Sequence, residues 1–80
     1  MAELEREIIE IIAETLNVEK ERINLNSDLM TDLGADSLDG VDLTMKLEEK
    51  YKISIPEEKM QELRKVGEIV EYIKEKINYS

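Results

Sequence analysis

The spacing of apolar residues along the chain predicts a helix at each end. Near the amino terminus, an apolar residue recurs every fourth position, at Leu4, Ile8, Ile12 and Leu16. Residues at this spacing lie on one face of a helix, so the pattern predicts an amphipathic helix over residues 2–16. A second stripe predicts a last helix over residues 66–77. Its members are Val66, Ile69, Val70, Ile73 and Ile77.

Two further helices are predicted between these two. Asp36 is suited to cap a helix over residues 37–50, because its carboxylate can accept hydrogen bonds from the amides of the first turn. Pro56 suits the first position of a short helix over residues 56–63, and it favours an extended residue before it. The two glutamates that follow Pro56 agree with the positive end of the helix dipole.

A long connection joins the first two predicted helices. Residues 18–35 show no regular apolar pattern, apart from a short turn at residues 19–22. Loops of this length within a small domain are usually functional. Four aliphatic side chains are predicted to hold this loop against the core: Ile23, Leu25, Leu29 and Leu33.

These elements predict an all-α fold in a single domain, residues 1–80. It is a four-helix bundle with three longer helices, one short third helix and a long first loop. A chain of this size buries only about 60% of the surface that its unfolded form exposes. We therefore expect one thin core and one working surface.

The second predicted helix has apolar residues on two opposite sides. At about 100° per residue, Leu38, Val41 and Met45 lie on one side of it. Leu43 and Leu47 lie on the other side. A two-layer domain of this size covers one side of a helix more easily than both, so one of these stripes is expected to remain exposed.

Acidic residues indicate which stripe stays in water. Four carboxylates flank the Leu38 stripe: Asp39, Asp42, Glu48 and Glu49. We therefore expect Tyr51 and the Leu43 stripe to face the core. A small apolar patch ringed by charge is typical of a docking surface. The alternative is that Val41 and Met45 turn back into the core and only Leu38 is exposed.

Ser37 lies at the start of this helix, where the first amides and the helix dipole favour a phosphate group. The chain has no cysteine and no histidine, which excludes Ser-His-Asp and Cys-His sites and removes the usual base for activating a hydroxyl. The Ser37 hydroxyl is therefore better placed to be modified than to catalyse. Its position alone, however, favours an ordinary first-turn serine, which is common.

The charge balance narrows the choice of partners. Twenty acidic and eleven basic residues give a net charge of −9, which disfavours nucleic acid and anionic membranes and favours basic protein partners. No apolar run reaches the roughly 20 residues that span a bilayer, so no stable membrane insertion is expected. The acidic amino terminus is unlike a targeting peptide, so we expect the protein in the cytoplasm unless a targeting segment precedes this sequence. We also expect a monomer.

A calcium-binding EF-hand loop starting at Asp32 is excluded, because Ser37 and Leu43 occupy positions that require glycine and glutamate.

Residues 32–39, Asp-Leu-Gly-Ala-Asp-Ser-Leu-Asp, resemble the attachment motif of acyl carrier proteins of the bacterial (type II) fatty acid synthase. Three later segments are similar to that family in order and spacing. They are residues 47–49 followed by an aromatic residue, residues 55–58 and residues 70–73. The resemblance covers nearly the whole chain.

The resemblance implies that Ser37 carries a covalent 4'-phosphopantetheine arm, added from coenzyme A by a holo-acyl-carrier synthase. The arm would hold acyl chains as thioesters, and those chains are expected to lodge between the helices. The protein would be a carrier in fatty acid synthesis rather than an enzyme, without a metal site. The implied partners are ketoacyl synthases, reductases, dehydratases and acyltransferases with basic docking patches. The residues that match the family's docking surface are Asp36, Leu38, Asp39, Val41, Asp42, Met45, Glu48 and Glu49.

Four residues depart from the family pattern. Gly40 lies inside the second helix, where it costs about 1 kcal/mol relative to alanine; it would either loosen the first turns or allow a close backbone approach. Leu29 and Tyr51 stand where many members have phenylalanine. Lys65 stands where a serine or threonine cap is common. All four lie outside the motif and concern local stability rather than the role.

Two alternatives remain open at this point. The chain could carry acyl groups for another pathway, such as polyketide, lipid A, lipoate or aminoacyl synthesis. It could also be an acidic interaction module in which Ser37 is unmodified or phosphorylated.

Overall fold

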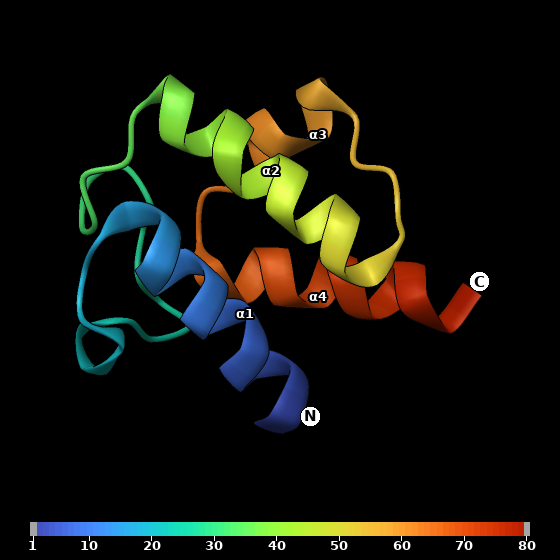
Figure 1. The fold of residues 1–80 in the computed structure, drawn as a ribbon, viewed down its shortest axis with the longest axis horizontal. Helices are drawn as coiled ribbons and strands as arrows, with labels where there is room; N and C mark the ends of the chain where they lie inside the picture. Colours follow the sequence, from blue (N-terminus) through green and yellow to red (C-terminus); the bar gives the residue numbers. More distant parts are fainter. Residues whose placement is uncertain (1, 80) are drawn as a thin grey trace.

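Four α-helices and one 3-10 turn form in the predicted order in a computed structural model that describes residues 2–79. The helices are α1 (Ala2–Leu16), α2 (Ser37–Tyr51), α3 (Glu57–Glu62) and α4 (Val66–Tyr79), and the turn η1 (Lys20–Arg22) follows α1 (Figure 1). The described residues contain an isolated bridge between Asp28 and Lys65 but no strand. The all-α prediction, with three longer helices and a short third one, is confirmed.

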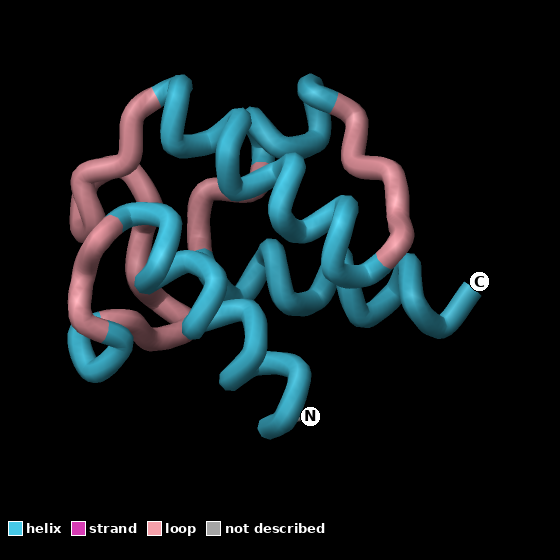
Figure 2. The backbone as a smooth tube through the Cα atoms, viewed as in Figure 1, coloured by secondary structure: helices cyan, strands magenta, loops and turns pink. Residues whose placement is uncertain are grey.

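The two connections of α2 lie at opposite ends of the molecule. Figure 2 shows the long α1–α2 loop folded at one end and the α2–α3 connection at the other. Helix α1 packs against both α2 and α4, and these three helices enclose the core. Within residues 2–79, no helix has both the length and the apolar character needed to cross a bilayer.

The core consists of the aliphatic stripes that the sequence pattern predicts. Each longer helix contributes residues that are at most 1% exposed, because burial of one helical face removes apolar surface from water. Partly buried residues such as Leu4, Leu16 and Tyr51 pack around them. The most fully buried large side chains are Ile8, Ile12, Leu43, Leu47, Val66, Ile69 and Ile73.

The long loop is attached to the core differently from the prediction. Ile23 and Leu29 are buried and Leu33 is half-buried, as expected, but Leu25 is 40% exposed and its predicted side-chain contact is wrong. Instead, the Leu25 carbonyl accepts a hydrogen bond from the Gly67 amide at 2.9 Å. A Cβ atom on Gly67 would lie 3.0 Å from that carbonyl oxygen, so glycine permits this close approach.

The start of α4 lacks a serine or threonine cap, and a glutamate replaces it. The Glu68 carboxylate accepts hydrogen bonds from the amides of Arg64 and Lys65 at 3.0 and 3.1 Å. These contacts, with Lys65 the larger cause, lower the pKa of Glu68. The departure at Lys65 is therefore compensated from the first turn of the same helix.

Two predicted boundaries of the short third helix are wrong. Pro56 is not its first helical residue but its N-cap, because its ψ of 147° is still extended. Its carbonyl accepts a hydrogen bond from the Met60 amide at 3.0 Å, which begins the helix at Glu57. The helix ends at Glu62, with Leu63 as the C-cap.

Candidate functional site

Ser37 is the first residue of α2, and its side chain is exposed. The residue before it, Asp36, is the N-cap, and its Oδ1 accepts a hydrogen bond from the Asp39 amide at 2.9 Å. In return, the Asp39 carboxylate accepts a hydrogen bond from the Asp36 amide at 3.2 Å. The predicted Asp36 cap is confirmed, and the capping box fixes the backbone on both sides of Ser37.

The reciprocal role of Asp39 was not predicted from the sequence. An acidic residue three positions after an N-cap is the known signal for a capping box, and Asp36 and Asp39 have that spacing. The sequence pattern predicts Asp39 only as part of the acidic rim of a docking surface. The structure uses its carboxylate to hold the start of the helix.

The loop before Ser37 is ordered by its own polar groups. The Asp28 carboxylate accepts hydrogen bonds from the amides of Met30 and Thr31 at 2.9 and 3.0 Å, and the Asp32 carboxylate accepts one from the Asp28 amide at 2.8 Å. The Thr31 amide is the largest cause of the lowered pKa of Asp28. Gly34 then turns the chain with a φ of 75°, a conformation that favours glycine. The loop therefore presents Ser37 at a defined place.

The exposed side of α2 is the one that the acidic residues indicate. The side chains of Leu38, Val41 and Met45 are 77, 51 and 61% exposed. Leu43 and Leu47 are buried. The alternative in which Val41 and Met45 turn back into the core is therefore wrong. We call the exposed stripe of Leu38, Val41 and Met45 the α2 apolar patch.

The acidic residues around this patch have different surroundings. Asp42 and Glu49 are exposed, as predicted for a rim. Glu48 is half-buried, and its Oε2 accepts a hydrogen bond from the Ile55 amide at 2.7 Å. Within residues 2–79, no three carboxylates gather as metal ligands do. Of the acidic residues predicted around the patch, Asp42 and Glu49 are therefore exposed, whereas Asp39 and Glu48 accept hydrogen bonds from backbone amides.

Tyr51 fastens the end of α2 to α1. Its ring is half-buried, and its hydroxyl donates a hydrogen bond to the Glu7 carboxylate at 3.0 Å. Burial, followed by the contact with Glu7, raises the pKa of the Tyr51 hydroxyl. The tyrosine thus fills the predicted core-facing position while keeping its polar end satisfied.

A groove of about 870 Å³ opens between α2 and α3, beside Ser37. This volume lies within the range of small-molecule sites. The sequence predicts that a chain can lodge between helices but does not say between which. The apolar side chains along the groove are Leu29, Met30, Val41, Met45, Ile55, Met60 and Leu63. We call it the α2–α3 groove.

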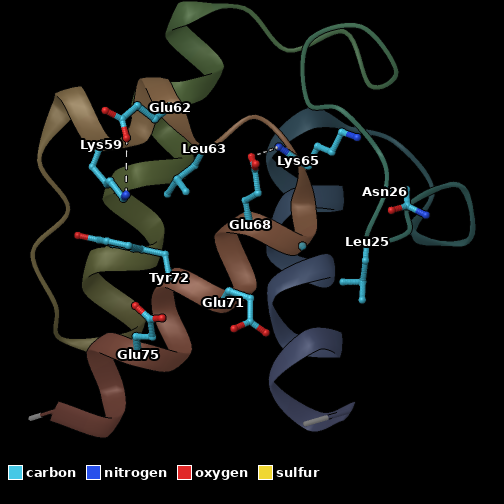
Figure 3. A pocket seen from close by; sticks show the side chains of 11 residues that line it. Leu25, Asn26, Lys59, Glu62, Leu63, Lys65, Glu68, Glu71, Tyr72 and Glu75 are labelled. Carbon is cyan, nitrogen blue, oxygen red and sulfur yellow. Dashed lines mark hydrogen bonds and ion pairs between the residues drawn. The ribbon is translucent and has the colours of Figure 1, made fainter.

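A second hollow, of about 590 Å³, lies between α3, α4 and the middle of the long loop (Figure 3). The Lys59 and Lys76 ammonium groups lie 5.5 and 5.6 Å from the centre of the Tyr72 ring, at cation–π distance. Lys59 also pairs with Glu62 at 3.6 Å. Of these contacts, the one between Lys59 and Tyr72 joins α3 to α4. The residues lining this hollow include none of the predicted site residues.

Several proteins named acyl carrier protein are similar to this chain in sequence. An acyl carrier protein of Porphyromonas gingivalis is 38% identical over 77 residues, covering 96% of this chain and 99% of the relative. One from Wolinella succinogenes is 48% identical over 67 residues, covering 84% of this chain and 88% of the relative. One from Phytoplasma mali is 42% identical over 73 residues, covering 91% of this chain and 87% of the relative.

A family described as the phosphopantetheine attachment site matches residues 6–73. The chain belongs to the acyl carrier protein family. Acyl carrier proteins hold acyl groups on covalent 4'-phosphopantetheine, which is therefore the cofactor of this chain. The residues present fit such a group, because an exposed hydroxyl begins a helix whose first amides have no intrahelical acceptor, and an apolar groove lies next to it.

Proposed function

We propose that Ser37 is the attachment residue and that this carrier delivers acyl thioesters to enzymes of fatty acid synthesis. The observation that carries the proposal is the position of Ser37: exposed, first in α2, inside a capping box and beside the α2–α3 groove. When bound, the arm supplies a terminal thiol that holds the acyl group. The residues of this chain hold the tether point, shield the cargo and present a docking surface.

Among the described serines, the surroundings favour Ser37. Ser27 is 5% exposed, and its hydroxyl oxygen accepts a hydrogen bond from the Asn24 amide at 3.0 Å. Ser54 is exposed but lies in the connection between α2 and α3, away from a helix start. Ser37 has both the exposure that a transferase needs and the helix amides that stabilise a phosphodiester.

We propose that residues 1–80 form one carrier domain, which acts as a monomer in the cytoplasm and is not an enzyme. The two carboxylates nearest to Ser37 in the chain accept hydrogen bonds from backbone amides, so they hold the backbone rather than activate the hydroxyl. The chain has no histidine or cysteine to take that role. Ser37 is therefore a tether point, and the chemistry belongs to partner enzymes.

Incubation with coenzyme A and a holo-acyl-carrier synthase tests the attachment. We expect a mass gain of one phosphopantetheine arm, found on the proteolytic peptide that contains Ser37. Acyl species that copurify with the chain then identify the pathway: straight-chain fatty acyl groups support fatty acid synthesis. Lipoyl, polyketide or aminoacyl species instead favour a carrier for another pathway, because the thiol of the arm can hold any of these groups as a thioester.

The acidic rim of the α2 apolar patch is proposed to recognise basic partners. Because Asp42 and Glu49 are exposed, reversing either charge adds repulsion without removing a hydrogen bond of the fold. We expect Asp42→Lys or Glu49→Lys to weaken binding to a ketoacyl synthase by about threefold to tenfold at low salt, and less as salt is added.

The matched control for this prediction is Glu71→Lys, an exposed glutamate on α4, which makes the same charge change outside the patch. Titration calorimetry at two salt concentrations measures the effect. If all three variants bind equally while remaining folded, the docking surface does not lie on α2.

The α2–α3 groove is proposed to shield the acyl chain. Burial of each methylene group contributes about 0.8 kcal/mol, and for a domain of this size 1 kcal/mol corresponds to roughly 4–8 °C in melting temperature. We therefore expect the melting temperature of the acylated chain to rise as the acyl group is lengthened, until the groove is full. Calorimetry on holo and acylated forms measures this rise, and a melting temperature that stays level across chain lengths would contradict it.

A further inference from the structure

Gly40 lies on the wall of the α2–α3 groove, one helical turn after Ser37. Glycine is unfavourable inside a helix, because it loses the most conformational freedom on folding. The backbone does not require it here, since Gly34 is the glycine with a positive φ in the described chain. A second reason must therefore be sought in the surroundings of Gly40.

Packing does not require glycine at this position either. A Cβ atom on Gly40 would meet nothing within 4 Å, apart from its own helix and chain neighbours. The expectation that Gly40 allows a close backbone approach is therefore wrong. At Gly67, by contrast, such an atom would lie 3.0 Å from the Leu25 carbonyl oxygen. The space that a side chain would fill at Gly40 belongs to the groove.

The α2–α3 groove has a buried end and an exposed end. Leu29, Ile55 and Leu63 are buried, so they form its inner end. Met30 and Met45 are 55 and 61% exposed, so they form its mouth. Ser37 is exposed as well, and a cargo tethered to it therefore enters at the mouth. The apolar tail favours the inner end, and the polar thioester favours the wet mouth.

We propose that Gly40 determines acyl specificity, by leaving room in the groove for acyl groups that are broad near the thioester, namely branched or β-substituted chains. The inference rests on the proposed function, because it concerns the cargo of the same site. Gly40 is half-buried and lines the groove. The proposal places the first carbons of the cargo beside it. The methionines that line the groove have flexible side chains, and they can adapt to a broader cargo once the helix wall leaves space for it.

The test compares acylated and holo forms of the wild type, Gly40→Ala and Gly40→Leu. Each is loaded at Ser37 from coenzyme A thioesters with a straight chain or with a 3-methyl-branched chain of equal carbon number. The measured quantity is the melting temperature of the acylated form minus that of the holo form. This difference removes the gain in helix propensity, which for Gly40→Ala we expect to raise every form by about 4–8 °C.

We expect the wild type to gain similarly from straight and branched chains. Gly40→Leu should lose most of the gain from the branched chain and retain more of the gain from the straight one, with Gly40→Ala between them. Lys46→Leu is the matched control, because it adds the same side chain to an exposed position of α2 that does not line the groove. It should leave both differences unchanged.

The outcomes separate this inference from the function on which it rests. A wild-type chain that accepts no arm overturns both. One that accepts the arm but gains nothing from any acyl group overturns the groove as the cargo site, and this inference with it, but not the attachment at Ser37. A wild-type chain that gains from both cargoes, with Gly40→Leu gaining equally from both, overturns the role of Gly40 alone. If leucine lowers the melting temperature of the holo form too far for comparison, Gly40→Ala decides the question, because it narrows the groove with a small, rigid, helix-favouring side chain, and equal gains from both cargoes would then overturn the role of Gly40.

Discussion

Replacement of Ser37 by alanine is expected to abolish attachment of the phosphopantetheine arm and to leave the fold intact. The loss is complete because the arm needs an oxygen atom at this position, and alanine has none. The fold survives because Ser37 is exposed and the cap of α2 is made by Asp36 and Asp39. Mass spectrometry after incubation with coenzyme A and a holo-acyl-carrier synthase reads the first effect, and circular dichroism reads the second.

The matched control is Ser54→Ala, which removes an exposed hydroxyl from the connection between α2 and α3. This variant should gain the arm as fully as the wild type does. A Ser37→Ala chain that still gains the arm would move the attachment residue elsewhere, while a wild-type chain that refuses the arm from every competent transferase would leave an acidic interaction module as the better description.

Replacement of Leu47 by alanine is expected to remove a large part of the stability of the domain. Leu47 is fully buried in the second half of α2, and truncation of a buried leucine to alanine costs about 2–5 kcal/mol. A domain of this length has a free energy of unfolding on the order of 4–12 kcal/mol. We therefore expect the midpoint of urea denaturation to fall sharply, with part of the population unfolded at physiological temperature.

Met45→Ala provides the comparison on the same helix. Met45 is 61% exposed, so the same kind of truncation should change the free energy of unfolding by less than about 0.5 kcal/mol. The contrast between the two variants measures which side of α2 faces the core. Equal denaturation midpoints for Leu47→Ala and Met45→Ala would contradict the orientation of this helix.

The three longer helices could be predicted from the sequence because a buried face leaves a periodic trace. Ile8 and Ile12 lie one turn apart and are both fully buried, which is the simplest form of that signal. The orientation of α2 needed a second signal, since it is apolar on two sides. The exposed carboxylates of Asp42 and Glu49 supplied it, because such charges remain solvated unless they are paired.

The remaining features depend on tertiary contacts between segments that are far apart in the sequence. An apolar side chain such as Leu25 can be buried, but only the path of the loop decides that its backbone makes the contact instead. The role of Glu48 depends on the α2–α3 connection, which places the Ile55 amide seven residues away against its carboxylate. The α2–α3 groove arises from the same connection, so helical periodicity within α2 could not locate it.

The hydrogen bond between the Glu48 carboxylate and the Ile55 amide connects the proposed docking surface to the α2–α3 groove. Glu48 is in the set matched to the docking surface, and Ile55 belongs to the buried end of the groove. If a lysine or arginine of a partner enzyme drew the Glu48 carboxylate away from the Ile55 amide, that amide would lose its acceptor and the buried end of the groove would be less firmly held. Under the proposed function, enzyme docking and cargo binding would then be thermodynamically linked, and each would change the affinity for the other by the same factor.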